Sequence, residues 1–332
     1  MQKTYKNLII VAILVLAWSA EALVVTLPGD LTLSFSPKSP RASGIFAAEA
    51  KSFAFDTVRA NFTWFVNGKQ VASGVGLKEQ EFTAGKLGSL MTIRVVANSE
   101  DGLTYEAQAA LAISDIDFIV NSLTYTPAFY RGAALPTPGS TIEIFAVPHL
   151  FRGGSRLSAQ NLIYEWSLDN KPVLNQSGGG KNILTIDLAD VGGSNYTVGL
   201  KISTSDSSLT SEKTISLKTY QPEVLFYEVS SLMGVRPLAS NSFSVRAGNP
   251  FSVVAEPYYL SLNSIKSAKV EWRADGKIIS QPTGGEALEN PWLLELTSPA
   301  DSESQSVLSF KFEDARKIFQ RAGATLQITA TQ

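Results

Sequence analysis

The chain of 332 residues contains no cysteine and only one histidine, His149. Without cysteine there is no disulfide, no lipid-modified cysteine and no thiolate nucleophile or zinc ligand. Each domain must therefore hold itself together by burying its own apolar core. His149 follows a proline at the predicted end of a strand, and we interpret it as a rim residue rather than a catalytic base.

An excess of charge of one sign is also missing, since 28 Lys and Arg residues face 30 Asp and Glu residues. No basic stripe stands out, so we expect no nucleic-acid partner. Acidic residues near the expected junctions come in pairs, such as Asp115 with Asp117 and Glu100 with Asp101. A calcium ion takes six or more oxygen ligands, so we expect no metal or other cofactor, and calcium at a junction stays an open alternative.

Long apolar runs are confined to the N-terminus. Lys3 and Lys6 precede the apolar run Leu8–Trp18, and Ala20-Glu21-Ala22 follows it. This pattern predicts a signal peptide over residues 1–22, cleaved after Ala22. The alternative is an uncleaved N-terminal segment, which would be the chain's one membrane contact. We therefore expect an exported, extracytoplasmic protein, either secreted or held in the cell envelope.

What the chain does have is a tryptophan motif that recurs once per domain length. The motif occupies residues 61–69, 163–171 and 269–277, and its tryptophans lie 102 and 106 residues apart. In each copy the tryptophan shares one strand face with apolar neighbours two residues away. An Asn-Gly, Asp-Asn or Asp-Gly pair then predicts a tight hairpin turn. We expect Trp64, Trp166 and Trp272 to lie in three separate cores.

Further alternating segments predict an all-β chain. Tyr196 begins an alternating strand downstream of the second motif, and its ring is expected in that core. The one helical candidate is Glu313–Arg321, with Phe312, Ala315 and Phe319 on one side and Gly323 as a stop. Strands of this length with frequent turn signals are typical of β-sandwiches.

The repeat sets the predicted domains at residues 23–114, 115–218 and 219–332. The strand 196–202 resembles the penultimate strand of PKD-type Ig-like domains, and the tryptophan motifs resemble the corresponding tryptophan strand. The motifs depart from the usual Trp-Asp-Phe-Gly-Asp-Gly form of that family, so the resemblance extends to the Ig-like superfamily. The layout is also similar to exported Ig-like proteins of candidate-phylum bacteria, some of them associated with type IV pilus genes.

These features predict three tandem Ig-like (PKD-like) domains in a non-catalytic structural or binding protein of the envelope. An accessory role in a pilus or surface assembly and an adhesive role both fit, with a surface protein or a surface glycan as partner. Three sandwiches use nearly the whole mature chain, which leaves no room for a catalytic domain. The alternative is a carbohydrate-binding or glycan-active protein. Candidate contact residues are Tyr130, Tyr258, Tyr259 and Trp292, whose other interpretation is core packing.

Overall fold

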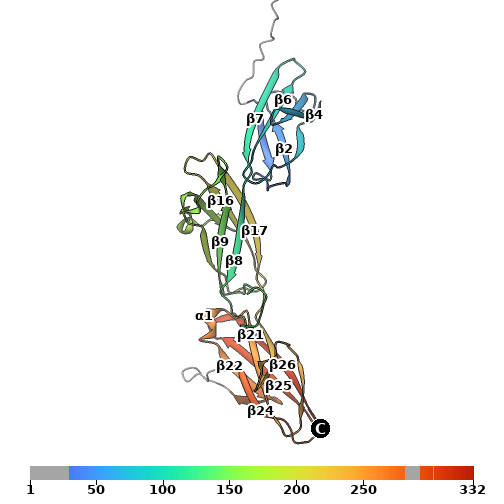
Figure 1. Ribbon diagram of the computed structural model, residues 1–332, viewed down its shortest axis with the longest axis vertical. Coiled ribbons are helices and arrows are strands. Elements are labelled where there is room, and N and C mark those ends of the chain that lie inside the picture. Colours follow the sequence, from blue (N-terminus) through green and yellow to red (C-terminus); the bar gives the residue numbers. More distant parts are fainter. Residues whose placement is uncertain (1–29, 281–291, 302) are drawn as a thin grey trace, which may run out of the picture. The chain divides into compact units, whose positions relative to one another are not determined.

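The computed structural model describes residues 30–280, 292–301 and 303–332. The predicted signal peptide, residues 1–22, lies outside the described residues. The described residues form mainly β-strands, which are arranged in pairs of facing sheets (Figure 1). We call the three pairs the first, second and third sandwich, defined by strands β1–β7, β8–β17 and β18–β26.

The first sandwich has a three-stranded sheet in the order β1-β2-β5 and a four-stranded sheet in the order β4-β3-β6-β7. Its strands are β1 (Thr32–Ser36), β2 (Ile45–Lys51), β3 (Asn61–Val66), β4 (Lys69–Val75), β5 (Glu79–Thr83), β6 (Leu90–Asn98) and β7 (Thr104–Ala112).

The second sandwich pairs the sheet β15-β9-β8 with the sheet β13-β12-β16-β17, to which β14 also pairs through β12. A small hairpin, β10-β11, lies outside both sheets. The strands of the second sandwich are β8 (Asp115–Ser122), β9 (Thr141–His149), β10 (Phe151–Arg152), β11 (Ser155–Arg156), β12 (Ile163–Leu168), β13 (Lys171–Pro172), β14 (Gly178–Gly179), β15 (Ile183–Asp187), β16 (Asn195–Ser203) and β17 (Thr210–Lys218). Two 3-10 turns, η1 (Ala159–Asn161) and η2 (Leu174–Gln176), flank β12 and β13.

The third sandwich pairs the sheet β19-β18-β21-β24 with the sheet β20-β26-β25-β22-β23, and only β20 and β26 run parallel in it. Its elements are β18 (Glu223–Ser230), β19 (Gly234–Val235), β20 (Ser242–Arg246), β21 (Pro250–Tyr258), α1 (Leu262–Ile265), β22 (Lys269–Ala274), β23 (Lys277–Ser280), β24 (Leu293–Thr297), β25 (Gln305–Asp314) and β26 (Lys317–Thr331).

By compactness the described chain separates into two units. The first holds residues 30–35, 47–82 and 91–111, and the second holds residues 36–46, 83–90 and 112–332. The second and third sandwiches both lie in the second unit. The predicted boundaries at 114/115 and 218/219 stay predictions.

The three repeat tryptophans are each at most 1% exposed. Trp166 lies in a core shared by both sheets of the second sandwich, and Trp272 lies in a different core in the third. Trp64 packs against Phe82 on β5, from the opposite sheet of the first sandwich, with ring centroids 5.8 Å apart. Each of the three tryptophans therefore lies between the two sheets of its own sandwich. Tyr196 is half-buried and packs at the edge of the second core.

The tight turn after each tryptophan is also confirmed. Asn67, Asp169 and Asp275 take positive φ angles of 49°, 49° and 46°. Each of these side chains also accepts a hydrogen bond of 2.8–2.9 Å from a backbone N–H of the neighbouring strand β6, β16 or β25. The turn residue therefore braces the hairpin against the adjacent strand in all three copies.

The predicted helix Glu313–Arg321 is wrong. Residues 305–331 form the hairpin of β25 and β26, in which Asp314 pairs with Lys317 around the turn at Ala315 and Arg316. A register shift separates this pair from the pair of Glu313 with Arg321. The apolar spacing in this short stretch also fits the two arms of a hairpin. Pairing along the whole length of β25 satisfies more backbone groups than a nine-residue helix would.

Candidate functional site

An extensive set of described contacts outside the three cores lies between the second and third sandwiches. The connection from β8 to β9, residues 123–140, leaves its own sandwich and lies against the third; we call it the strap. Tyr125 N–H donates to the carbonyl of Leu260 over 2.7 Å, and Tyr259 N–H donates to the carbonyl of Tyr125 over 2.7 Å. The strap is thus held by the same kind of backbone pairing that joins strands within a sheet.

Aromatic side chains fill the space under the strap. Strand alternation places Val254 and Tyr258 of β21 on the outer face of the third sandwich, together with Tyr227 of β18, and the structure buries all three. Phe129 of the strap lies edge-on to Tyr227, with centroids 5.0 Å apart, and Tyr130 lies edge-on to Tyr258 at 5.2 Å. These contacts make a second apolar cluster on a sheet face that would otherwise meet water.

The tyrosine hydroxyls of this cluster bond to one another. The hydroxyls of Tyr227 and Tyr258 lie 2.6 Å apart, and those of Tyr130 and Tyr259 lie 2.9 Å apart. Burial raises the pKa of Tyr227, Tyr258 and Tyr259 above the ordinary value of a phenol. All are therefore neutral at physiological pH, and none is activated as a base or nucleophile.

One carboxylate, Glu256, lies under the strap and is 7% exposed. The hydroxyl of Tyr125 donates to Glu256 Oε2 over 2.8 Å. Burial raises the pKa of Glu256, and the hydrogen bond from Tyr125 opposes that rise. A glycosidase uses two carboxyl groups that flank one open position. Glu256 instead has tyrosines around it and is covered by the strap, so this arrangement favours a structural role.

A buried amide ties the strap to the end of the long hairpin. Gln320 of β26 is fully buried, and its Oε1 accepts from the N–H of Ser261 over 2.7 Å. Its Nε2 donates to Thr137 Oγ1 over 2.9 Å and to the carbonyl of Pro138. Thr137 Oγ1 in turn donates to the carbonyl of Tyr259 over 2.9 Å. Three segments therefore meet at one side chain.

The tip of the same hairpin contacts a loop of the second sandwich. Asp190 accepts from the N–H groups of Ile318 and Phe319 over 2.6 and 3.1 Å. A Cβ atom added to Gly192 would lie 2.7 Å from the ring of Phe319, so a glycine is needed for this approach. The ammonium of Lys317 donates to the carbonyl of Gly139, at the end of the strap.

The structure places all four predicted contact residues at or beside this junction. Tyr258 and Tyr259 are buried, and Tyr130 of the strap is half-buried against them. The half-buried Trp292 packs against both the cluster and the third core. They do not form an exposed aromatic platform. Sequence reasoning missed Tyr125, Glu256 and Gln320, although the dense aromatics at 125–130 were a usable signal.

The predicted acidic pair at the start of the second sandwich lies beside a lysine and the histidine. Lys213 Nζ lies 3.2 Å from Asp115 Oδ1 and 3.8 Å from Asp117 Oδ1, and His149 Nε2 lies 2.9 Å from Asp117 Oδ2. Lys213 thus pairs with both carboxylates. Within residues 30–280, 292–301 and 303–332, no group of three or more His, Cys, Asp or Glu side chains is gathered.

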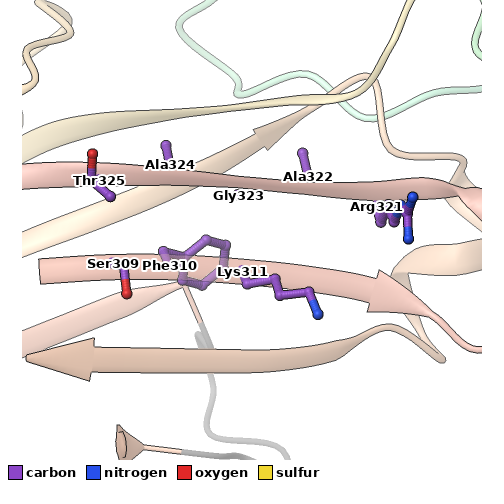
Figure 2. Close-up of a pocket in the computed structure, with 8 residues that line it drawn as sticks. All are labelled: Ser309, Phe310, Lys311, Arg321, Ala322, Gly323, Ala324 and Thr325. Carbon is purple, nitrogen blue, oxygen red and sulfur yellow. The ribbon is translucent and has the colours of Figure 1, made fainter. Parts of the chain in front are cut away.

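A shallow depression lies along β25 and β26 around Gly323 (Figure 2). Lys311 and Arg321 contribute cations to its lining, and Ser309 and Thr325 contribute hydroxyls. Lys311 already pairs with Glu313 over 2.7 Å. Among the described residues, the lining contains no carboxylate and no imidazole. Among the residues that the structure describes, no helix is long and apolar enough to cross a membrane.

No protein-family model and no curated protein matches the chain. Among solved structures, it is similar to the three N-terminal domains of the Highly Immunogenic Outer Capsid protein of bacteriophage RB49. The identity is 16%, over 91% of this chain and 98% of that one, with a TM-score of 0.25. The central fibronectin-III array of RIM-binding protein gives 9% identity over 90% and 96%, with a TM-score of 0.31. Immunoglobulin domains 1–5 of Sidekick-1 give 12% over 88% and 56%, with a TM-score of 0.29.

The paired sheets and separate tryptophan cores define the class of the protein: it is built of tandem Ig-like β-sandwiches. No family within that class is established by these comparisons.

Proposed function

We propose that the protein is a non-catalytic structural or binding component of the cell envelope, exported through its N-terminal segment. Its sandwiches act as spacers, and its second and third sandwiches work as one joined module. An accessory role in a pilus or other surface assembly is the specific form of this proposal. The adhesive form would use the same module to present a terminal surface.

The observation that supports the proposal is that two buried polar side chains form hydrogen bonds across the junction between the second and third sandwiches. Glu256 and Gln320 are both buried, and both bond across the junction rather than toward an open cleft. Burying such groups costs free energy unless they are paired, so a chain that buries them between domains stabilises one relative arrangement. A spacer that carries load or sets a distance needs that property, and an enzyme's reaction does not.

Four measurements on the full chain test this function. Fractionation of cells that express it should place the chain in the envelope or the medium, and cross-linking there should capture a surface protein. A screen of glycans and esters should show no turnover. Robust turnover that is lost on substitution of one carboxylate would overturn the proposal. Glycan-array binding lost in Trp292→Ala with an intact fold would favour the carbohydrate-binding alternative.

A further inference from the structure

The strap has a counterpart in the third sandwich. It follows β8, the first strand of the second sandwich, and residues 231–249 follow β18, the first strand of the third. Strand β8 pairs antiparallel with β9, and β18 pairs antiparallel with β21 in the same manner. Both connections therefore leave the same end of their sandwich. In the second sandwich that end holds the next sandwich of the chain.

The counterpart carries apolar side chains that are largely exposed within one chain. Residues 231–233 form the turn between β18 and β19, and in it Leu232 and Met233 are 94% and 85% exposed. Leu238, a few residues later, is 75% exposed. Single exposed apolar residues are common, but three within seven residues of one connection form a patch of the kind found at interfaces. We call residues 231–238 the tail turn.

The surface that the strap contacts also has a counterpart, in the first sandwich. The strap bonds to the connection from β21 to β22, and the tip of the β25–β26 hairpin contacts the second sandwich beside it. The corresponding connections of the first sandwich are residues 52–60, before the tryptophan strand β3, and residues 99–103, between β6 and β7. We call these two loops the head loops. Phe53 is fully exposed there, and Val58 and Leu103 are exposed as well.

The two surfaces carry opposite net charge. The connection 231–249 contains Arg236 and Arg246 and no acidic residue, and Arg236 pairs with Glu228 of β18 over 2.6 Å, which leaves a net charge of +1 when Glu228 is counted. The head loops contain Asp56, Glu100 and Asp101 together with Arg59, which lies 3.6 Å from Asp56 and 3.5 Å from Glu100, so their net charge is −2. Opposite charges steer two surfaces together and fix their register.

From this repeat of one junction, we infer that the tail turn of one copy docks on the head loops of a second copy of the chain. The contact joins two different surfaces, so each pair still carries one unused tail turn and one unused set of head loops, and association continues until a ring closes or the growing assembly is capped. The inference rests on the proposed structural role and names its partner. A monomeric chain without turnover would end this inference and leave the structural role standing.

The test uses the full chain, expressed with its own N-terminal segment and extracted in mild detergent. Light scattering after size-exclusion chromatography should show a mass that rises with concentration, and added salt should lower it. Leu232→Asp replaces an apolar contact residue of the tail turn with a charge, and Phe53→Asp does the same in the head loops. Each should raise the concentration at which pairs form by about tenfold or more, as loss of a central apolar contact does. Leu174→Asp, at an exposed leucine of the second sandwich, is the matched control and should change nothing.

Mixing the two variants gives the decisive measurement. Phe53→Asp keeps an intact tail turn, and Leu232→Asp keeps intact head loops. An equal mixture should therefore form pairs and no longer chains, although neither variant associates alone. Three outcomes would overturn the inference: a wild-type chain that stays monomeric at every concentration, association that both variants leave unchanged, or an equal loss in Leu174→Asp.

Discussion

The hydroxyl of Tyr125 donates to Glu256 Oε2 over 2.8 Å, and the two residues belong to different sandwiches. Tyr125 lies in the strap of the second sandwich, and Glu256 lies on β21 of the third. Among the residues that the structure describes, none forms an ion pair with Glu256. Burial favours the neutral form of the Glu256 carboxyl group, and the hydrogen bond from Tyr125 only partly opposes this. The stability of the junction should therefore depend on pH.

The first prediction is a loss of stability as the pH rises through the titration of Glu256. Burial raises its native pKa above the ordinary value of 4.5, so the folded chain keeps a proton that the unfolded chain has already released. The free energy of unfolding should therefore fall from about pH 4.5 up to the native pKa and then level off. Glu256→Gln should flatten this decline. Urea unfolding at a series of pH values measures it.

Tyr125→Phe provides the opposite change at the same contact. It removes the hydrogen bond that lowers the pKa of Glu256, so the native pKa should rise further and the decline should extend to higher pH. If the free energy of unfolding changes with pH in the same way in the wild type and in Glu256→Gln, burial at the junction does not raise the pKa of Glu256.

The second prediction concerns the amide of Gln320. Gln320→Leu keeps the approximate volume but leaves the N–H of Ser261 and the carbonyl of Pro138 without this partner. A cost of about 1–3 kcal/mol in the free energy of unfolding is expected. Gln327→Leu, on an exposed position of the same strand, should change it by less than about 0.5 kcal/mol. Equal effects of the two substitutions would contradict the role of Gln320 in the junction.

The sequence was sufficient to predict the sandwiches because their determinants are local and periodic. Trp64, Trp166 and Trp272 mark equivalent strands, and the turn pairs after them carry their own conformational preference. The junction depends on single residues far apart in the chain, such as Tyr125 with Glu256, and no period connects them. The hairpin 305–331 was misassigned in part for a related reason, since its short arms carry apolar spacings that suit a helix as well.

The third prediction tests the close approach of the hairpin tip to the second sandwich. Gly192→Ala would place a methyl group 2.7 Å from the ring of Phe319, so the tip must move and the bonds from Ile318 and Phe319 to Asp190 should weaken. Hydrogen exchange at those two amides should become faster. Gly179→Ala, where an added Cβ meets nothing within 4 Å, is the matched control. Unchanged exchange in Gly192→Ala would mean that the contact is loose in solution.

The fourth prediction concerns the tryptophan on which the second core depends. Trp166 is buried, and its Nε1 donates to the carbonyl of Lys181 over 2.9 Å. Trp166→Ala should cost about 3–5 kcal/mol, because it leaves a cavity among residues of both sheets. Trp166→Phe should cost less, since it keeps most of the apolar contact and loses only the donor to Lys181. Denaturant unfolding measures both values, and a loss below about 1 kcal/mol for Trp166→Ala would contradict a core role.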